Sequence, residues 1–486
     1  MTKHYRLLID GEWVDGANGE YDIVNPATEA VIGSAPEASA DQSLAAARAA
    51  QAAFPAWSRT PPAERARLLN AVAEKLRERA ADLVPLIISE TGATAMVGSR
   101  MQVPVAIERF ERYARGAMKD LNIPLAPSPT GATPLAPGGL IGAVVNRQPV
   151  GAVACISPYN FPLVNMAGKI APALAVGCTV VMKPAPQDPL AIIELAEIMH
   201  EVGFPPGVVN VITSSQPEPA AALTDTRDID MVSFTGSTGV GERIFAAGGK
   251  TMKRLLLELG GKGAGLVLDN ADLDVAVGAI ASVWAFHSGQ ICTAPTRAIV
   301  HASRYDELVS RLAAYAPNLK VGDPTSMDTI VGPVISALQR DRIESYVAAG
   351  EREGAEVVVD GRRPSHMEHG FYVGPTLLAR CKQGMTPVQE EIFGPVVVVV
   401  PFDDDDEAIA LANSTDFGLY DYVFSTDSDR AYRTAKQLRS GNVGINTAQR
   451  NHDSPFGGFK MSGVGRDGGD FGMLAYTEMQ TIVWPG

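Results

Sequence analysis

Positive charge is scarce in this chain. Its 486 residues include 41 lysines and arginines against 55 aspartates and glutamates, which gives a formal net charge of −14. A protein that binds nucleic acid through the phosphate backbone needs a basic surface. The charge balance therefore argues against a nucleic-acid partner.

Cysteine is also rare. The four cysteines are Cys155, Cys178, Cys292 and Cys381, and no two of them form a C-x-x-C pair. This spacing indicates neither a disulfide scaffold nor a zinc site, and it suits a reducing compartment. We therefore expect a protein without a bound metal, in which an isolated cysteine remains available as a nucleophile.

Long apolar runs are missing as well. The two longest charge-free stretches, 121–146 and 148–168, each contain several prolines that would break a membrane-spanning helix. The apolar run at 7–9 is too short for the hydrophobic region of a secretory signal. These observations predict a cytoplasmic protein with no membrane partner.

The remaining composition is that of a large globular protein. At roughly 150 residues per domain, the length corresponds to about three domains. Amphipathic helical patterns cover 40–81, and the segment 121–139 is rich in Pro and Gly, which predicts a loop or an irregular hairpin. After residue 150, short β-branched runs alternate with helical patterns, and a second such set follows residue 260. This alternation predicts two α/β lobes with doubly wound parallel sheets, hinged near 259–262.

Two glycine-rich segments invite a dinucleotide-binding interpretation. The segment 463–468 matches G-x-G-x-x-G, but it follows no strand and only 18 residues come after it, too few for a βαβ unit. The segment FTGSTGVG at 234–241 follows a predicted strand and opens a predicted helix. Its backbone N–H groups and the helix dipole suit a pyrophosphate, so we expect the cofactor at the less regular match.

Glu258 and Cys292 are the two candidate reactive residues. Glu258 lies about 20 residues beyond Gly236, the spacing of an acid that binds the cofactor ribose. Its place at the end of a predicted strand, where the chain crosses between lobes, also suits a general base. Cys292 follows a predicted helix and is a candidate nucleophile, although a lone cysteine is more often a small buried hydrophobe. The residues alone leave both alternatives open.

Two polar clusters resemble metal sites but have simpler interpretations. Asp403–Asp406 precede the helical pattern AIALAN, where acidic side chains favourably face the positive end of a helix. His366 and His369 lie in a polar stretch without helical pattern, so they lack the one-face geometry of a zinc site. We interpret the first cluster as helix capping and the second as a solvated loop.

Eight motifs in order make the sequence resemble the NAD(P)-dependent aldehyde dehydrogenase superfamily over essentially its whole length. The resemblance implies an α/β fold with a Rossmann-like cofactor-binding lobe, a catalytic lobe and a small β oligomerisation element. It places the cofactor-binding domain at 1–125 and 149–259, the catalytic domain at 260–465 and the oligomerisation elements at 126–148 and 466–486. The motifs are SPYNFP (157–162), VMKPAP (181–186), FTGSTGVG (234–241), LELGGK (257–262), GQICTAPTR (289–297), EEIFGPV (390–396), GNVGINT (441–447) and PFGGFKMSG (455–463).

The resemblance also implies a catalytic role for three residues. Cys292 is similar to the family nucleophile, which attacks the aldehyde carbonyl and forms a thiohemiacetal. Asn160 resembles the side-chain amide that stabilises the oxyanion, together with the backbone N–H of Cys292. Glu258 resembles the base that activates water for hydrolysis of the thioester, which lowers the weight of its ribose-binding alternative.

For the cofactor, the resemblance implies NAD or NADP. The residues expected to contact the cofactor lie at its pyrophosphate, its adenosine ribose and its nicotinamide ribose. Gly260 and Lys262 at the lobe junction are interpreted as structural residues. At position 186, where NAD-preferring members commonly carry an acid, this chain has proline. Proline supplies no acceptor and no negative charge, so NADP is also acceptable. The implied cofactor residues are Lys183, Gly236, Ser237, Glu391 and Phe393.

The substrate is an aldehyde whose class the resemblance leaves open. Small Gly168, where many relatives carry a bulky aromatic, predicts a roomy tunnel for an apolar or aromatic aldehyde. Against this, Arg450 and His452 could bind the carboxylate of a semialdehyde. The implied tunnel residues are Phe161, Asn165, Gly168, Phe286, Ile291, Thr293 and Phe456.

The resemblance also bears on two alternative functions and on the oligomeric state. A CoA-acylating relative typically lacks the water-activating glutamate, and a non-catalytic relative is expected to have lost Cys292, Asn160 or Glu258; all three are present. The Pro-rich hairpin at 126–148 and the C-terminal strand at 476–484 correspond to the family's oligomerisation elements. We therefore expect a homodimer or a homotetramer.

Overall fold

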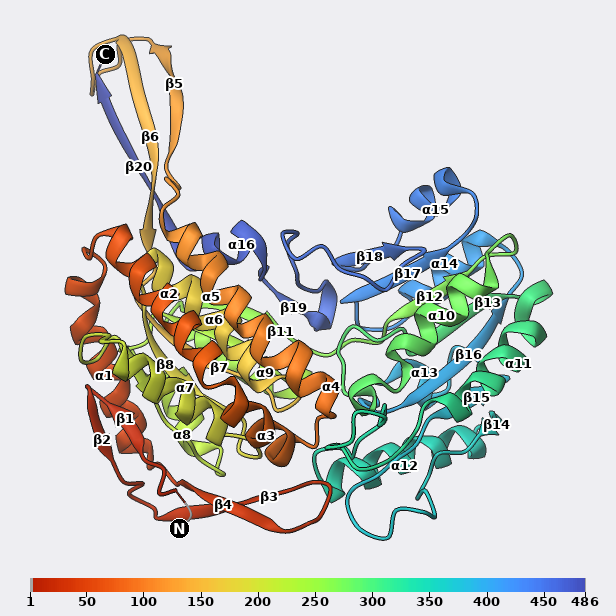
Figure 1. Cartoon of the computed structure of the whole chain (residues 1–486). Helices are drawn as coiled ribbons and strands as arrows, with labels where there is room; N and C mark the ends of the chain where they lie inside the picture. Colours follow the sequence, from red (N-terminus) through yellow and green to blue (C-terminus); the bar gives the residue numbers. More distant parts are fainter. Residues whose placement is uncertain (1–2, 486) are drawn as a thin grey trace.

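Two large α/β lobes lie side by side, and a narrow three-stranded sheet projects from one of them (Figure 1). The structure is a computed structural model and describes residues 3–485. The first lobe contains the early helices and the second contains the elements between about residues 264 and 445, as the colours of Figure 1 follow. From about residue 463 the chain returns to the first lobe and ends in the projecting sheet. The predicted pair of α/β lobes is confirmed.

The first lobe is built on an eight-stranded sheet in the order β19-β11-β10-β7-β8-β9-β1-β2. Its five central strands are parallel, whereas β19, β1 and β2 pair antiparallel at the edges. The parallel strands are β7 (Ala152–Ile156), β8 (Thr179–Lys183), β9 (Val209–Val211), β10 (Met231–Thr235) and β11 (Arg254–Glu258). The edge strands are β1 (Leu7–Ile9), β2 (Glu12–Val14) and β19 (Gly463–Val464).

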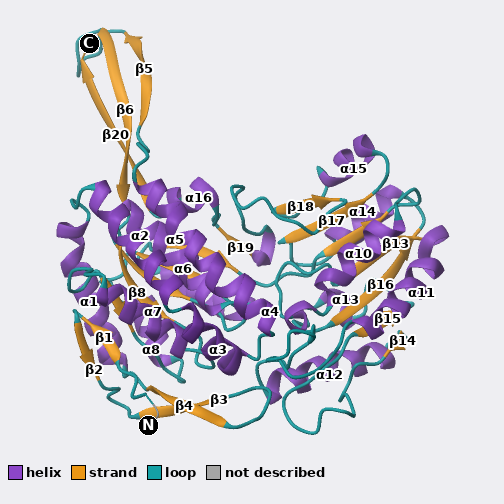
Figure 2. Ribbon diagram, viewed as in Figure 1, coloured by secondary structure: helices purple, strands orange, loops and turns teal. Residues whose placement is uncertain are grey.

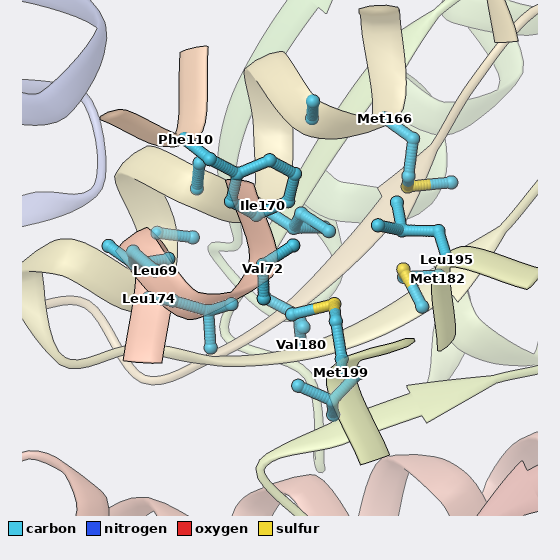
Figure 3. Close-up of a cluster of buried hydrophobic side chains, with 14 of the residues drawn as sticks. Leu69, Val72, Phe110, Met166, Ile170, Leu174, Val180, Met182, Leu195 and Met199 are labelled. Carbon is cyan, nitrogen blue, oxygen red and sulfur yellow. The ribbon is translucent and has the colours of Figure 1, made fainter. Parts of the chain in front are cut away.

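Apolar side chains between the helices and this sheet form the core of the first lobe. Figure 3 shows Phe110 and Ile170 packing near Met182 and Met199, and all four side chains are fully buried. Full burial of such a side chain stabilises the fold by about 1.5–3 kcal/mol. The helices are α1 (Ala40–Trp57), α2 (Pro62–Glu78), α3 (Ala80–Thr91), α4 (Ala95–Val97), α5 (Val103–Ala117), α6 (Pro162–Val176), α7 (Leu190–Glu201), α8 (Glu218–Asp225), α9 (Thr238–Gly249) and α16 (Gly469–Leu474).

The second lobe is built on a seven-stranded sheet in the order β14-β15-β16-β13-β12-β17-β18. All strands are parallel except edge strand β14, and the valine run of β16 is buried on both faces as expected. The strands are β12 (Ala264–Val267), β13 (Arg297–His301), β14 (Glu356–Val359), β15 (Thr376–Ala379), β16 (Val396–Phe402), β17 (Tyr420–Phe424) and β18 (Asn442–Ile445). The helices are α10 (Leu273–Trp284), α11 (Tyr305–Tyr315), α12 (Ala337–Arg352), α13 (Thr386–Gln389), α14 (Asp405–Asn413) and α15 (Ser428–Ala435).

The acidic cluster at 403–406 caps a helix. The side chain of Asp404 accepts a hydrogen bond from the backbone N–H of Glu407 at 2.9 Å, at the start of α14. Asp405 and Asp406 lie in the first helical turn, near the positive end of the helix dipole, and Asp403 lies one residue before the cap. The capping interpretation is confirmed.

The projecting sheet consists of β5 (Ile123–Thr130), β6 (Gly139–Pro149) and β20 (Thr477–Pro485), and the C-terminus lies near its tip (Figure 2). The Pro-rich segment is thus an irregular hairpin, with a register shift between Leu125 and Ser128. Large apolar side chains of this sheet are exposed, among them Leu125, Leu140, Met479, Ile482, Val483 and Trp484.

Two details concern the smaller elements. Strands β3 (Glu20–Val24) and β4 (Val31–Pro36) form a separate antiparallel ribbon. Strand β19, which the sequence places at the end of the catalytic domain, pairs with β11 of the first lobe. The domain boundaries themselves stay predictions. Among residues 3–485, no helix is both long and apolar enough to cross a membrane.

Candidate active site

A backbone turn in the left-handed region precedes Cys292. His287, Ser288 and Gly289 have φ values of 50°, 56° and 70°, and two of the three are not glycine. Such conformations persist only where the surroundings hold them. The Ser288 hydroxyl supplies one anchor by donating to the carbonyl of Gly332 at 2.7 Å. The turn therefore fixes the direction in which the chain enters the Cys292 loop.

Cys292 is half-buried, whereas the other three cysteines are buried in the two lobes. Burial and, to a smaller extent, the charge of Glu391 raise the pKa of the Cys292 thiol to about 12, and the charge of Arg450 opposes both. The next carbonyl, that of Thr293, accepts a hydrogen bond from the Tyr422 hydroxyl at 2.6 Å. The thiol is therefore protonated at neutral pH and lies in a loop held on both sides.

Asn160 lies between β7 and α6 and its side chain is buried. Its amide nitrogen donates to the carbonyl of Gln290 at 2.8 Å, two residues before Cys292. The ring Nε2 of His287 donates to the backbone carbonyl of Asn160 at 2.5 Å. Burial lowers the pKa of His287 to about 4, so this histidine is neutral. One amide N–H of Asn160 is used at Gln290, and the second can donate beside the thiol.

Glu258 ends β11, where its backbone pairs with Gly463 of β19. Both carboxylate oxygens are buried and have no hydrogen-bond partner among residues 3–485. Gly457 leaves space for the carboxylate of Glu258, since a Cβ at position 457 would lie 2.8 Å from Oε1 of Glu258. Burial raises the pKa of Glu258 well above its usual range, and the charge of Asp467 adds to the rise. A Cβ at Gly261, three residues after Glu258, would lie 2.4 Å from the carbonyl oxygen of Cys292, so the chain after β11 passes beside the Cys292 loop. The charge of Glu258 also raises the pKa of the Cys292 thiol.

Two charged residues that shift the pKa of Glu258 are not among the residues predicted from the sequence. Asp467 raises the pKa of Glu258 and Lys169 lowers it. Lys169 is fully buried in α6, and its Nζ lies 3.4 Å from the Ser233 hydroxyl. A single charge in the apolar helix sequence PLVNMAGKIAPALAV was the available signal for Lys169. No comparable signal marked Asp467.

Gly236 and Ser237 lie between β10 and the N-terminus of α9. Ser237 is the N-cap residue, yet its exposed side chain makes no capping hydrogen bond. A Cβ at Gly236 would lie 2.4 Å from the ring of Phe234, so only glycine fits there. Free N–H groups at a helix N-terminus and an unused hydroxyl suit a phosphate group, as the sequence predicts.

Lys183 ends β8, and its Nζ donates to the carbonyls of Pro184 at 3.0 Å and Ser214 at 3.3 Å. Burial lowers the pKa of Lys183 to about 8, while the charge of Glu37 acts in the opposite direction. Burial also raises the pKa of Glu37, but hydrogen bonds from Ser214 and Ser215 outweigh it and keep the carboxylate charged. A negative charge therefore lies near Lys183 although position 186 is proline.

Glu391 and Phe393 reach the lobe junction from the second lobe. Oε1 of Glu391 accepts the backbone N–H of Gly261 at 2.8 Å, and burial raises the pKa of this carboxyl. A Cβ at Gly260 would lie 2.4 Å from Oε2 of Glu391, so the glycine has a structural role there. Lys262 is buried, and burial lowers its pKa to about 7. The role of Glu391 as a contact of the cofactor ribose stays a prediction.

The expected tunnel residues gather around the Cys292 loop only in part. The rings of Phe161 and His287 lie 4.8 Å apart, centroid to centroid. Gly168 does not open an empty apolar space, because a Cβ there would lie 1.8 Å from Nη1 of Arg109. The guanidinium of Arg450 lies 3.9 Å from the ring centroid of Phe456. Half-buried side chains consistent with a lining position are those of Phe161, Asn165, Phe286, Ile291, Thr293 and Phe456.

Comparisons with known proteins identify the family of this chain. The model of the aldehyde dehydrogenase family matches residues 13–482. The chain is 36% identical over 487 residues to a 3-succinoylsemialdehyde-pyridine dehydrogenase of Pseudomonas sp, covering 99% of both proteins. It is also 36% identical to the chloroplastic betaine aldehyde dehydrogenase of Beta vulgaris, covering 98% of this chain and 95% of that protein.

Solved structures give the same result. The structure of betaine aldehyde dehydrogenase from Staphylococcus aureus in complex with NAD+ matches with a TM-score of 0.93 and 36% identity, over 99% of this chain and 94% of that one. The NAD+ complex of an aldehyde dehydrogenase from Bacillus cereus matches with a TM-score of 0.92 and 35% identity, over 99% and 97%. The chain therefore belongs to the aldehyde dehydrogenase family and is an oxidoreductase that acts on an aldehyde.

Proposed function

We propose that this protein oxidises an aldehyde to the carboxylic acid with NAD or NADP, through a covalent intermediate on Cys292. The observation that supports the proposal is that Asn160 and the chain just after Glu258 both contact the Cys292 loop. The amide of Asn160 contacts the loop of Cys292, and Glu258 acts electrostatically on its thiol. A nucleophile, an oxyanion donor and a base are the groups that acyl chemistry needs.

The first step is addition of the Cys292 thiolate to the aldehyde carbon. The C–S bond forms, the carbonyl oxygen becomes an oxyanion, and the free amide N–H of Asn160 donates to it together with the backbone N–H of Cys292. A bound nicotinamide cofactor supplies the hydride acceptor for the oxidation. Gly236 and Ser237 would hold its pyrophosphate, Lys183 its adenosine ribose and Glu391 its nicotinamide ribose, with Phe393 packing nearby.

The second step is hydrolysis of the thioester left on Cys292. Glu258 takes a proton from water, the resulting hydroxide adds to the acyl carbon, and the C–S bond breaks to release the carboxylate and the thiolate. The raised pKa of Glu258 suits this task, since a carboxylate with a higher pKa is a stronger base. The presence of Glu258 disfavours a CoA-acylating enzyme, and the complete set of three residues disfavours a non-catalytic relative.

The test is formation of reduced nicotinamide by the purified protein without CoA. NAD and NADP are supplied separately against aromatic, long aliphatic and carboxylate-bearing aldehydes. Turnover in the absence of CoA is the expected result. Silence with every pair, followed by activity only after CoA is added, would replace hydrolysis by acyl transfer to CoA.

Nucleotide preference should respond to position 186. Pro186→Glu is expected to raise the KM for NADP about tenfold and to leave the KM for NAD within about twofold, because a carboxylate there would repel a 2′-phosphate. Initial rates at varied NAD and NADP measure both constants. Pro186→Gln is the matched uncharged control. An unchanged KM for NADP in the glutamate variant would remove position 186 from nucleotide selection.

The rate should rise with pH. The pKa of the Cys292 thiol is raised to about 12, so its thiolate is a minor form at neutral pH, and burial also raises the pKa of Glu258. Raising the pH increases the deprotonated forms of both groups, and kcat/KM should climb by up to about tenfold per pH unit on this limb. Initial rates between about pH 6 and about pH 10 give the profile. A flat profile would show that neither proton limits the reaction.

Assembly and location follow from the projecting sheet and the cysteines. We expect a homodimer or a homotetramer in which a partner subunit covers the exposed apolar side chains of β5, β6 and β20. The domain division at residues 125, 149, 259 and 465 belongs to the same proposal. A reducing compartment such as the cytoplasm suits an enzyme that depends on a free thiol.

A further inference from the structure

A pocket lined by residues of both lobes carries more positive charge than an apolar aldehyde needs. Its walls come from α5, from the loop at 450–456 and from the segment 467–469. Arg109, Arg450, His452 and Phe456 all face this pocket. Because the whole chain carries a net negative charge, a local cluster of arginines is a distinctive feature of this pocket.

Arg109 occupies the space that Gly168 leaves open. A Cβ at position 168 would lie 1.8 Å from Nη1 of Arg109, so any larger residue there would displace the guanidinium. Nη1 donates to the carbonyl of Val164, one turn earlier in α6, at 2.9 Å. A guanidinium has five N–H donors, and this bond uses one. Gly168 therefore makes room for the guanidinium of Arg109 and not for an apolar group of the substrate.

Arg450 approaches the same pocket from the opposite lobe. Its guanidinium lies 3.9 Å from the ring centroid of Phe456, a cation–π contact that leaves the N–H edge free. Arg450 is exposed, so its free N–H groups remain accessible to a ligand. Desolvation by the surrounding protein atoms lowers the pKa of Arg450, and the nearby charge of Arg109 lowers it further. The two guanidinium groups are thus close enough to repel each other.

Neither Arg109 nor Arg450 has a carboxylate in ion-pair contact within the described residues, although the charge of Asp467 in the same pocket acts favourably on Arg450. In contrast, Arg112 of the same pocket contacts Asp453 and also Glu108 at 3.5 Å. Asp467 lines the pocket too, but its Oδ1 accepts the backbone N–H of Gly468 at 2.6 Å. Burial lowers the pKa of His452, followed by the charge of Arg450, so the histidine is neutral. The free cations are therefore the two arginines.

The pocket adjoins the segment that carries Asn160, because Arg109 in its wall donates to the carbonyl of Val164, four residues after Asn160. The positive charge of Arg450 lowers the pKa of Cys292, against the larger raising effects of burial and of Glu391. Phe456, whose ring packs against the guanidinium of Arg450, belongs to the expected substrate tunnel. An anion held between the two arginines would relieve their repulsion and would set the distance of the rest of the ligand from Cys292.

We propose that Arg109 and Arg450 together bind a carboxylate at the end of the substrate remote from the aldehyde, so that the preferred substrate is a carboxylate-bearing aldehyde. This inference rests on the proposed aldehyde oxidation and names its substrate class. It favours the semialdehyde alternative over an apolar or aromatic aldehyde without charge. It also disfavours aldehydes that carry a quaternary ammonium group, because two unpaired guanidinium groups repel a cation.

The test compares each acid with its neutral methyl ester. The two pairs are succinate semialdehyde with its methyl ester and 4-carboxybenzaldehyde with methyl 4-formylbenzoate. For at least one pair, kcat/KM for the acid should exceed that for the ester by about tenfold or more. Arg109→Met with Arg450→Met should lower kcat/KM for the acid by about 100-fold, mainly through KM, and change that for the ester by less than about threefold.

Matched variants separate charge from folding. Arg109→Lys keeps a positive charge and should retain part of the preference, and Arg115→Met removes an exposed arginine of α5 outside the pocket and should change nothing. If esters are oxidised as well as acids by the native protein, the carboxylate proposal fails while the aldehyde oxidation stands. If the double variant keeps the preference for the acid, the two arginines are not its source.

A second readout needs no turnover. Alkylation of Cys292 by iodoacetate or by iodoacetamide displaces iodide and forms the same type of C–S bond, and the two reagents differ in charge. The rate ratio of iodoacetate to iodoacetamide should fall about tenfold in the double variant. An unchanged ratio overturns the anion pocket even if no aldehyde is oxidised, in which case the proposed function fails separately.

Discussion

Replacement of Cys292 by alanine should abolish aldehyde oxidation while cofactor binding survives. The substitution removes the only atom that can form the covalent bond to the substrate and touches none of the residues proposed to hold the nucleotide. Loss of a covalent nucleophile costs about 10⁴-fold or more in turnover. Because Cys292 is half-buried in a loop held by neighbouring hydrogen bonds, the shorter side chain should leave the fold intact.

Two measurements check this result. Reduced-nicotinamide formation gives the turnover, and quenching of protein fluorescence by added NAD or NADP gives nucleotide binding. Cys381→Ala is the matched control, since that cysteine is buried in the second lobe away from the site. Near-normal turnover in the Cys292 variant would refute its assignment as the nucleophile.

Replacement of Glu258 by glutamine should trap the acyl-enzyme. Glutamine has the shape of glutamate, and both carboxylate oxygens are free of protein hydrogen bonds among residues 3–485, so the change should not disturb packing. It removes the base that activates water but leaves the thiol and the amide of Asn160. The steady-state rate should fall by about 10²–10⁴-fold, while one equivalent of reduced nicotinamide still forms rapidly.

Intact-protein mass spectrometry detects the trapped species. The Glu258→Gln variant, mixed with aldehyde and oxidised cofactor, should gain the mass of one acyl group. The double variant Glu258→Gln with Cys292→Ala should gain none, which assigns the adduct to the thiol. Rapid turnover without an adduct in the single variant would point to another base, and the charged neighbours Asp467 and Lys169 would be examined next.

The two-lobe architecture was predictable because alternating short strands and helices allow few topologies. Buried parallel strands such as β8 and β16 produce continuous apolar runs, which are visible in one dimension. The acidic N-terminus of α14 was predictable for a similar reason, since a helix cap involves residues three positions apart. Local patterns of this kind can be recognised in the sequence without knowledge of the tertiary fold.

The substrate pocket was not predictable from the same patterns. Gly168 suggested empty space, but the space is taken by Arg109, which lies 59 residues earlier in an ordinary amphipathic helix. The packing of α5 against α6 creates that contact, and no local spacing records it. Arg450 was identified as a candidate anion ligand, yet its partner in the pocket is Arg109 and not the neutral His452.

The proposed oxidation is tested most directly by its product balance. Native protein, aldehyde and oxidised cofactor are incubated without CoA, and reduced nicotinamide and carboxylate are quantified in the same samples. Hydrolysis of a thioester on Cys292 predicts equal amounts of both products over many turnovers. A single equivalent of reduced nicotinamide per protein, with no released carboxylate until CoA is added, would contradict the assignment of Glu258 as the base for hydrolysis.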